Sequence, residues 1–90
     1  MKSIKQFLAE NDELIHAKMK KVVSHVQRQQ GDWFLNTVLI DQYDVPFKYK
    51  RKRRYQSLQG ARVDMIYYAD KENIAGMEFE FMKVVKIAQS

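Results

Sequence analysis

The spacing of apolar residues changes at Gly31, and this change constrains the fold more than any other feature of the chain. Before Gly31, a set of apolar residues falls within an arc of about 60° when each residue turns by about 100°, which is the pattern of an amphipathic α-helix. The set is Ile4, Leu8, Ile15, Met19, Val22 and Val26. From Trp33 onward, apolar and polar residues alternate with a period of two, which is typical of β-strands. The chain is therefore predicted to contain a helical region followed by a sheet.

The helical region is predicted over residues 3–30, ending where Gly31 supplies a C-terminal glycine. Asn11-Asp12 interrupts the apolar pattern, and two interpretations stay open. In one, the helix is kinked or split there, with Asn11 or Asp12 capping a second helix. In the other, the helix is unbroken and spans about 40 Å. Since a domain of this size is roughly 31 Å across, such a helix would overhang it and need another surface.

Four strands are predicted after the helix, over residues 33–40, 45–57, 61–68 and 76–87. The links between them are short, which favours antiparallel neighbours. Met77, Phe79 and Phe81 share one face of the last strand, and this apolar face is expected to pack on the helix. The predicted fold is a single α+β domain over residues 1–90, with the order α-β-β-β-β.

The 90-residue length and the lack of cysteine limit how such a domain is stabilised. Small domains without disulfides often gain stability by self-association, so a homodimer through the N-terminal helix or a sheet edge is a candidate. There is no apolar run near 18 residues, so no membrane span is predicted. The N-terminal stretch lacks the continuous apolar core of a signal peptide, and the cytoplasm is the expected location.

Residue types that carry catalysis or bind metals are scattered. His16 and His25 are nine residues apart, which on one helix places them on opposite sides and excludes a shared metal. The acidic residues stand singly at turns or on strands, and no pair indicates acid–base chemistry. The glycines are isolated at expected turns, so no phosphate-cradling loop is present. The sequence predicts neither an enzyme nor a cofactor site.

The strongest functional signal is a basic run between Lys48 and Arg54. The net charge of the chain is +5, and this run alone carries +6, so the other residues sum to −1. A concentrated charge creates a field that an anionic partner can feel. The candidate residues for polyanion binding are Lys48, Lys50, Arg51, Lys52, Arg53 and Arg54. Tyr55 and Tyr68 are candidates for stacking on bases.

The predicted strand divides these residues between two faces. Lys48, Lys50, Lys52 and Arg54 alternate onto the open face, where they would contact phosphates without reading sequence. Phe47 and Tyr49, on the other face, are expected in the core. Arg51 and Arg53 share that face and would reach a ligand only if the strand ran past the helix.

Three functional interpretations follow. The leading one is a non-enzymatic module that binds RNA, DNA or another polyanion. The second is a protein–protein adaptor or structural homodimer, in which the basic strand is solvated, pairs with Asp64, Glu78 and Glu80, meets an acidic protein, or guards the sheet against edge pairing. Membrane-surface attachment is the weakest, because the run does not sit on an amphipathic helix.

Overall fold

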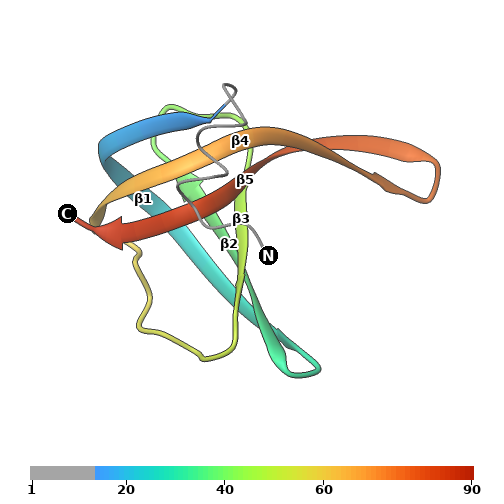
Figure 1. The fold of residues 1–90 in the computed structure, drawn as a ribbon, viewed down its shortest axis with the longest axis horizontal. Helices are drawn as coiled ribbons and strands as arrows, with labels where there is room; N and C mark the ends of the chain where they lie inside the picture. Colours follow the sequence, from blue (N-terminus) through green and yellow to red (C-terminus); the bar gives the residue numbers. More distant parts are fainter. Residues whose placement is uncertain (1–13) are drawn as a thin grey trace.

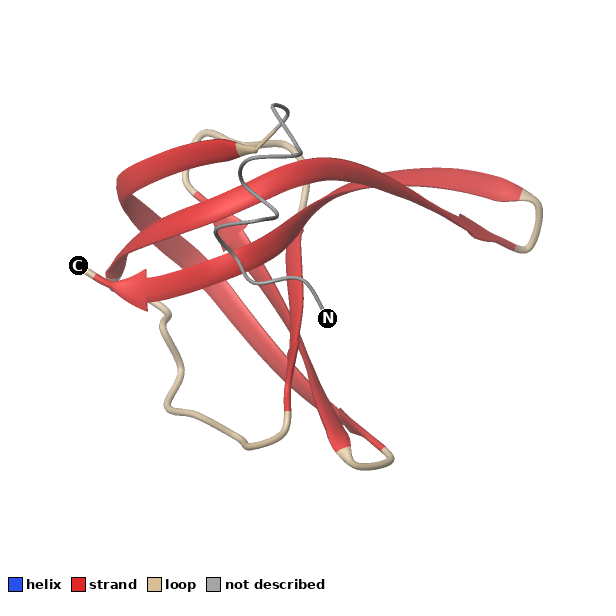
Figure 2. Ribbon diagram, viewed as in Figure 1, coloured by secondary structure: helices blue, strands red, loops and turns tan. Residues whose placement is uncertain are grey.

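The computed structural model describes residues 14–90, and in that range the chain forms five strands and no helix. The strands are β1 (Ile15–Gln30), β2 (Trp33–Ile40), β3 (Phe47–Arg51), β4 (Arg62–Ile74) and β5 (Met77–Gln89). They close into one barrel in the order β1-β2-β3-β5-β4, with β1 also paired to β4 (Figure 1). Figure 2 shows the same strands and their connecting loops. Residues 14–90 contain no helix that could span a membrane.

The predicted α+β fold is wrong. Residues 15–30, assigned to the helical region, form β1, the longest strand of the barrel. The sheet is also not wholly antiparallel, because β3 pairs with β5 in parallel through Phe47–Met82 and Lys48–Lys83. The predicted kink or break at Asn11-Asp12 lies outside the described residues.

Two irregularities in β1 explain why its apolar residues imitate a helix. The register shifts between Ala17 and Lys20, and again between Val22 and Ser24. Each extra residue reverses which side chains face inward, so the simple alternation of a strand is lost. Ala17 and Val22 are buried, whereas much of the predicted helical stripe is exposed, including Met19 at 56%. The period that predicted a helix therefore does not correspond to a buried face.

The first irregularity is fixed by side chains from β4. Met19 has a φ of 57°, an uncommon value for a residue with a side chain. The Asp64 carboxylate accepts a hydrogen bond from the Met19 amide at 2.9 Å, and the Arg62 guanidinium donates to the Met19 carbonyl at 3.1 Å. These bonds hold an irregularity inside the part of β1 that pairs with β4, because Ala17 before it and Lys20 after it both pair with that strand.

The other strands differ from prediction mainly in length. β2 has the bounds expected from the sequence, but β3 ends at Arg51, whereas the predicted strand ran to residue 57. β4 continues to Ile74 through residues that were predicted as a loop. Ala75 and Gly76 both have positive φ values and join β4 to β5, as in the two-residue turns that suit twisted hairpins.

The core is the interior of the barrel. Its buried residues come from all five strands: Ala17, Val22, Val38, Ile40, Phe47, Tyr49, Val63, Met65, Tyr67, Val84 and Ile87. Phe47 is fully buried and lies edge-on to Tyr67, with ring centroids 4.8 Å apart. Phe47 and Tyr49 are thus in the core, although they pack against strands and not against a helix.

We expect Asp64 to make stability depend on acid pH. Hydrogen bonds from the Met19 amide and the Ser90 hydroxyl lower the pKa of Asp64 below its ordinary value of 3.8. A lowered pKa in the folded state means that this stabilisation is present above pH 3.8 and is lost as pH falls through the folded-state pKa. Urea unfolding between pH 5 and pH 2 should therefore show a smaller acid-dependent loss for Asp64→Asn than for the wild type. Identical pH profiles would contradict this role.

Candidate nucleic-acid interface

The outer face of β3 carries alternating lysines, Lys48 and Lys50, in a fixed register with the neighbouring strands. Lys50 pairs with Leu35, and Leu35 in turn pairs with Arg28 on β1. Lys48 pairs with Thr37 on one side and with Lys83 of β5 on the other. Because directly opposite residues project from the same side of a sheet, these cations share one face.

Lys52, just beyond β3, continues this face toward the end of the β1–β2 hairpin. Its ammonium lies 4.1 Å from the centroid of the Trp33 ring, a cation–π contact. Trp33 is 41% exposed and is the single tryptophan of the chain. An aromatic surface thus lies directly beside a cation of the basic run.

A groove of about 640 Å³ runs over this face and is lined by residues from all five strands. Its floor is the sheet of β1, β2 and β3, and its side wall is the β4–β5 hairpin, which extends beyond the barrel (Figure 1). Among the lining residues that the structure describes, the cations are Arg28, Lys48, Lys50 and Lys83, and the single carboxylate is that of Glu72.

The groove cations differ in how they are compensated. The Lys48 ammonium lies 2.6 Å from a carboxylate oxygen of Glu72 and 5.2 Å from the centroid of the Phe81 ring. Within residues 14–90, Arg28, Lys50 and Lys83 form no ion pair. The groove therefore holds three cations that an anionic ligand could pair with.

The salt bridges predicted for the basic strand do not form as expected. Glu78 lies 3.5 Å from Lys71, its neighbour in the β4–β5 hairpin, and Asp64 is engaged at the β1 irregularity. Glu72, which was not among the predicted partners, pairs with Lys48. β3 also lies between β2 and β5, so it is not an outermost strand in need of guarding.

The basic run itself divides into three groups. Lys48, Lys50 and Lys52 form the outer face. Arg51 points toward the end of the barrel, where its guanidinium lies 3.4 Å from the Ile87 carbonyl and 4.8 Å from the centroid of the Tyr55 ring. Arg53 and Arg54 are exposed on the loop between β3 and β4. The sequence grouped all six residues in one site, and the structure places three of them on the groove side.

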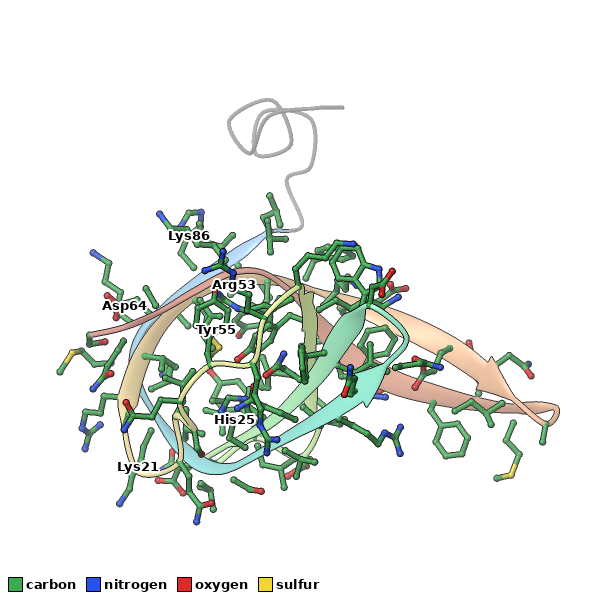
Figure 3. The ribbon with its side chains drawn as sticks, turned by 90° about the horizontal axis from the view of Figure 1, so that it is seen from below. Lys21, His25, Arg53, Tyr55, Asp64 and Lys86 are labelled. Atoms are coloured by element: carbon green, nitrogen blue, oxygen red, sulfur yellow. The ribbon has the colours of Figure 1, made fainter. Side chains whose placement is uncertain are left out.

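Residues 52–61 cross the end of the barrel as a loop that β1 holds in place. The Leu58 amide donates to Nδ1 of His25 at 2.8 Å, which leaves Nε2 of His25 to donate to the Asn36 side-chain oxygen at 2.8 Å. The Gln27 side-chain amide bonds both the carbonyl and the amide of Tyr55. Figure 3 shows His25, Arg53 and Tyr55 at this end of the molecule. His25 therefore links this loop to β2, a structural role that the sequence did not predict.

The two predicted stacking residues lie apart. Tyr55 is 51% exposed but faces Arg51 at the barrel end, away from the groove. Tyr68 is half-buried on β4 opposite Lys83, and burial followed by the nearby Asp70 carboxylate raises the pKa of its hydroxyl. Neither tyrosine lines the groove.

Sequence reasoning missed Trp33, Arg28 and Lys83 as members of this surface. Trp33 and Leu35 are two residues apart in one strand, so they project from the same face of the sheet. The sequence alone could therefore have placed Trp33 on this face. The positions of Arg28 and Lys83 depend on which strands are neighbours, and a helical assignment for residue 28 removed it from the sheet. No group of three or more potential metal ligands occurs within residues 14–90.

No protein-family model, no curated protein and no solved structure matches this chain. The class of the protein is therefore given by its own architecture, a small closed barrel of five strands with a cationic groove on its outer face.

We expect His25→Ala to loosen the loop between β3 and β4. The change removes the acceptor of the Leu58 amide and the donor to the buried Asn36 side chain, which should cost about 1–3 kcal/mol. The readouts are the free energy of unfolding in urea and the rate of trypsin cleavage at Lys52, Arg53 and Arg54. His16→Ala, at an exposed position of the same strand, is the control. Equal cleavage rates in both variants would show that His25 does not hold the loop.

Proposed function

We propose that this protein is a non-enzymatic binding module that engages the phosphate backbone of nucleic acid along the outer face of β2 and β3. The observation that carries the proposal is the presence of Arg28, Lys50 and Lys83 in one groove, without an ion pair inside the described range. Like charges held together on a rigid sheet repel one another. An anionic polymer that binds there relieves this repulsion and releases counterions.

The architecture supports this interpretation by analogy of fold alone. A closed barrel of five strands is also the architecture of the OB-fold, whose members bind oligonucleotides and oligosaccharides on strands 2 and 3 and on the β1–β2 and β4–β5 connections. Here the cationic groove lies over the same two strands and extends to Ile74, beside the β4–β5 connection. Of the two ligand classes, nucleic acid matches the positive charge.

The other residues of the basic run contribute to phosphate binding to different extents. Lys48 and Lys52 lie on the same face as Lys50, so they extend the contact along β3. Arg53 and Arg54 project from the loop and add long-range attraction. RNA and DNA both carry the required phosphates, and a nucleic-acid partner agrees with the cytoplasmic location and the absence of catalysis that the sequence predicts.

A second candidate function, contact with another protein or a second copy, is favoured by a different observation. Ile74 and Met77 at the end of the β4–β5 hairpin are 54% and 63% exposed. Exposed apolar side chains at such a tip suit a protein contact. Of the helix over residues 3–30 through which a dimer contact was predicted, residues 15–30 form β1 and residues 3–13 lie outside the described residues. Within the described residues, the hairpin is the candidate for a sheet-edge contact.

We expect Lys50→Glu with Lys52→Glu to weaken binding to a single-stranded oligonucleotide. Two lost phosphate contacts should lower the slope of log Kobs against log salt by about 1.4, since each contact contributes about 0.7 on a single strand. Binding is followed by the fluorescence of Trp33, the single tryptophan, at several salt concentrations. Duplex DNA and heparin are titrated in parallel.

The matched control is Lys18→Glu with Lys21→Glu, which makes the same charge change at exposed positions on the β4 side of β1. This control should retain most of the affinity. If both double variants lose affinity equally, the interaction follows net charge, and the outer face is not a specific site.

We expect Glu72→Gln to strengthen the same interaction. Glu72 neutralises Lys48 at 2.6 Å, and removal of its charge frees that lysine for a phosphate. The salt slope should become steeper by about 0.7, and the affinity at low salt should rise. A lower affinity would indicate that the Lys48–Glu72 pair instead builds the site.

A further inference from the structure

The β4–β5 hairpin continues beyond the barrel as a separate two-stranded arm, defined here as residues 70–81. β4 pairs with β1 only between residues 62 and 67, and β5 pairs with β3 only at Met82 and Lys83. From Asp70 to Phe81, the two strands pair with no other strand of the described residues 14–90. The arm projects clearly from the barrel in Figure 1. Isolated two-stranded hairpins are marginally stable in water, so a ligand that covered this arm would stabilise it.

The two faces of the arm have different chemistry. Directly opposite residues share a face, and the pairs on one face are Ile74 with Met77, Glu72 with Phe79, and Asp70 with Phe81. This face therefore carries four apolar side chains. The other face carries the pairs Lys71 with Glu80 and Asn73 with Glu78, and is polar throughout.

Phe79 is the residue of the apolar face that is most informative about ligand binding. Its position in an alternating apolar strand predicted a place in the core, but it is 44% exposed. The exposed ring sits on a strand in which every residue from Met77 to Glu80 is exposed. An aromatic side chain left open in this way is available to a ligand.

The apolar face of the arm is directed toward the cationic groove. The Glu72 carboxylate, opposite Phe79, reaches the Lys48 ammonium on β3, and Ile74 and Phe81 line the groove. The groove thus has a floor of cations and a wall formed by Ile74, Phe81 and the Glu72 carboxylate, with Phe79 on the same face of the arm opposite Glu72. A ligand that satisfies both surfaces must present negative charges on one side and flat apolar groups on the other.

We propose that the arm stacks on the bases of a single-stranded nucleic acid, with Phe79 as the principal stacking residue. This inference rests on the proposed function, since the lysines of the groove floor would hold the phosphates of the same strand. Single strands expose the faces of their bases, and stacking on aromatic side chains tolerates any sequence. Duplex nucleic acid keeps its base faces covered, and heparin has none. Selectivity for single strands therefore comes from the arm, and charge attraction comes from the groove floor.

The test compares two single-stranded probes of equal length and charge, a mixed-sequence oligodeoxynucleotide and an oligomer of abasic nucleotides. The wild type should bind the base-containing oligomer roughly 5- to 150-fold more tightly, corresponding to one stacked base. Phe79→Leu keeps an apolar side chain without a ring and should bind both probes equally. Phe79→Tyr keeps the ring and should restore the preference. Because Phe79 is exposed, all of these variants are expected to fold, which circular dichroism checks.

The outcomes separate this inference from the proposed function. If Phe79→Leu retains the preference for bases while Lys50→Glu with Lys52→Glu weakens both probes, the stacking role is wrong and phosphate binding stands. If the wild type binds neither probe at low salt, the proposed function fails. If light scattering gives a wild-type mass near twice 10.8 kDa and Phe79→Leu returns it to 10.8 kDa, the arm is a contact between copies, and the inference is overturned.

Discussion

The barrel closes through β1, which pairs with its two neighbours along successive parts of its length. β1 bonds to β4 with its first part and to β2 with its second part, and it must change direction between them. The pairing passes from β4 to β2 between Lys21 and Val22. Just before this point, within the part paired to β4, Met19 has a positive φ that is uncommon for a residue with a side chain. Arg62 and Asp64, both from β4, bond the two backbone groups of Met19. Because β1 pairs with β4 as well as with β2, the five described strands close into a barrel and do not end in two edge strands.

Closure also determines where charge and aromatic surface accumulate. Side chains alternate between the interior and the outer face, so Phe47 and Tyr49 fill the barrel while Lys48 and Lys50 stay outside. The short parallel pairing of β3 with β5 brings Lys83 beside Lys48. The same pairing ends at Met82, so the arm leaves the barrel directly above the cationic face. One topological feature therefore places a cationic surface beside an apolar one.

The sequence predicts the local features of this protein better than its long-range ones. The bounds of β2, the inward direction of Phe47 and Tyr49, and the outward direction of Lys48 and Lys50 follow from a period of two. The helical assignment of residues 14–30 failed because two register shifts disguised a strand, and tertiary pairing outweighed local preference. Arg28 and Lys83 were missed because the spacing of residues along the chain does not show which strands are neighbours or how they align. Phe79 was assigned to the core because the alternation of apolar and polar residues shows which residues share one face of a strand. It does not show whether another part of the protein covers that face.

The most direct measurement of the central claim is a map of backbone amide chemical shifts in the full chain, titrated with a single-stranded oligonucleotide. If the outer face and the arm form the binding surface, the largest changes will occur in β2, β3 and residues 70–81. The β4 side of β1, around Lys18 and Lys21, should change little. The largest changes on that side, or changes confined to residues 52–61, would contradict the account.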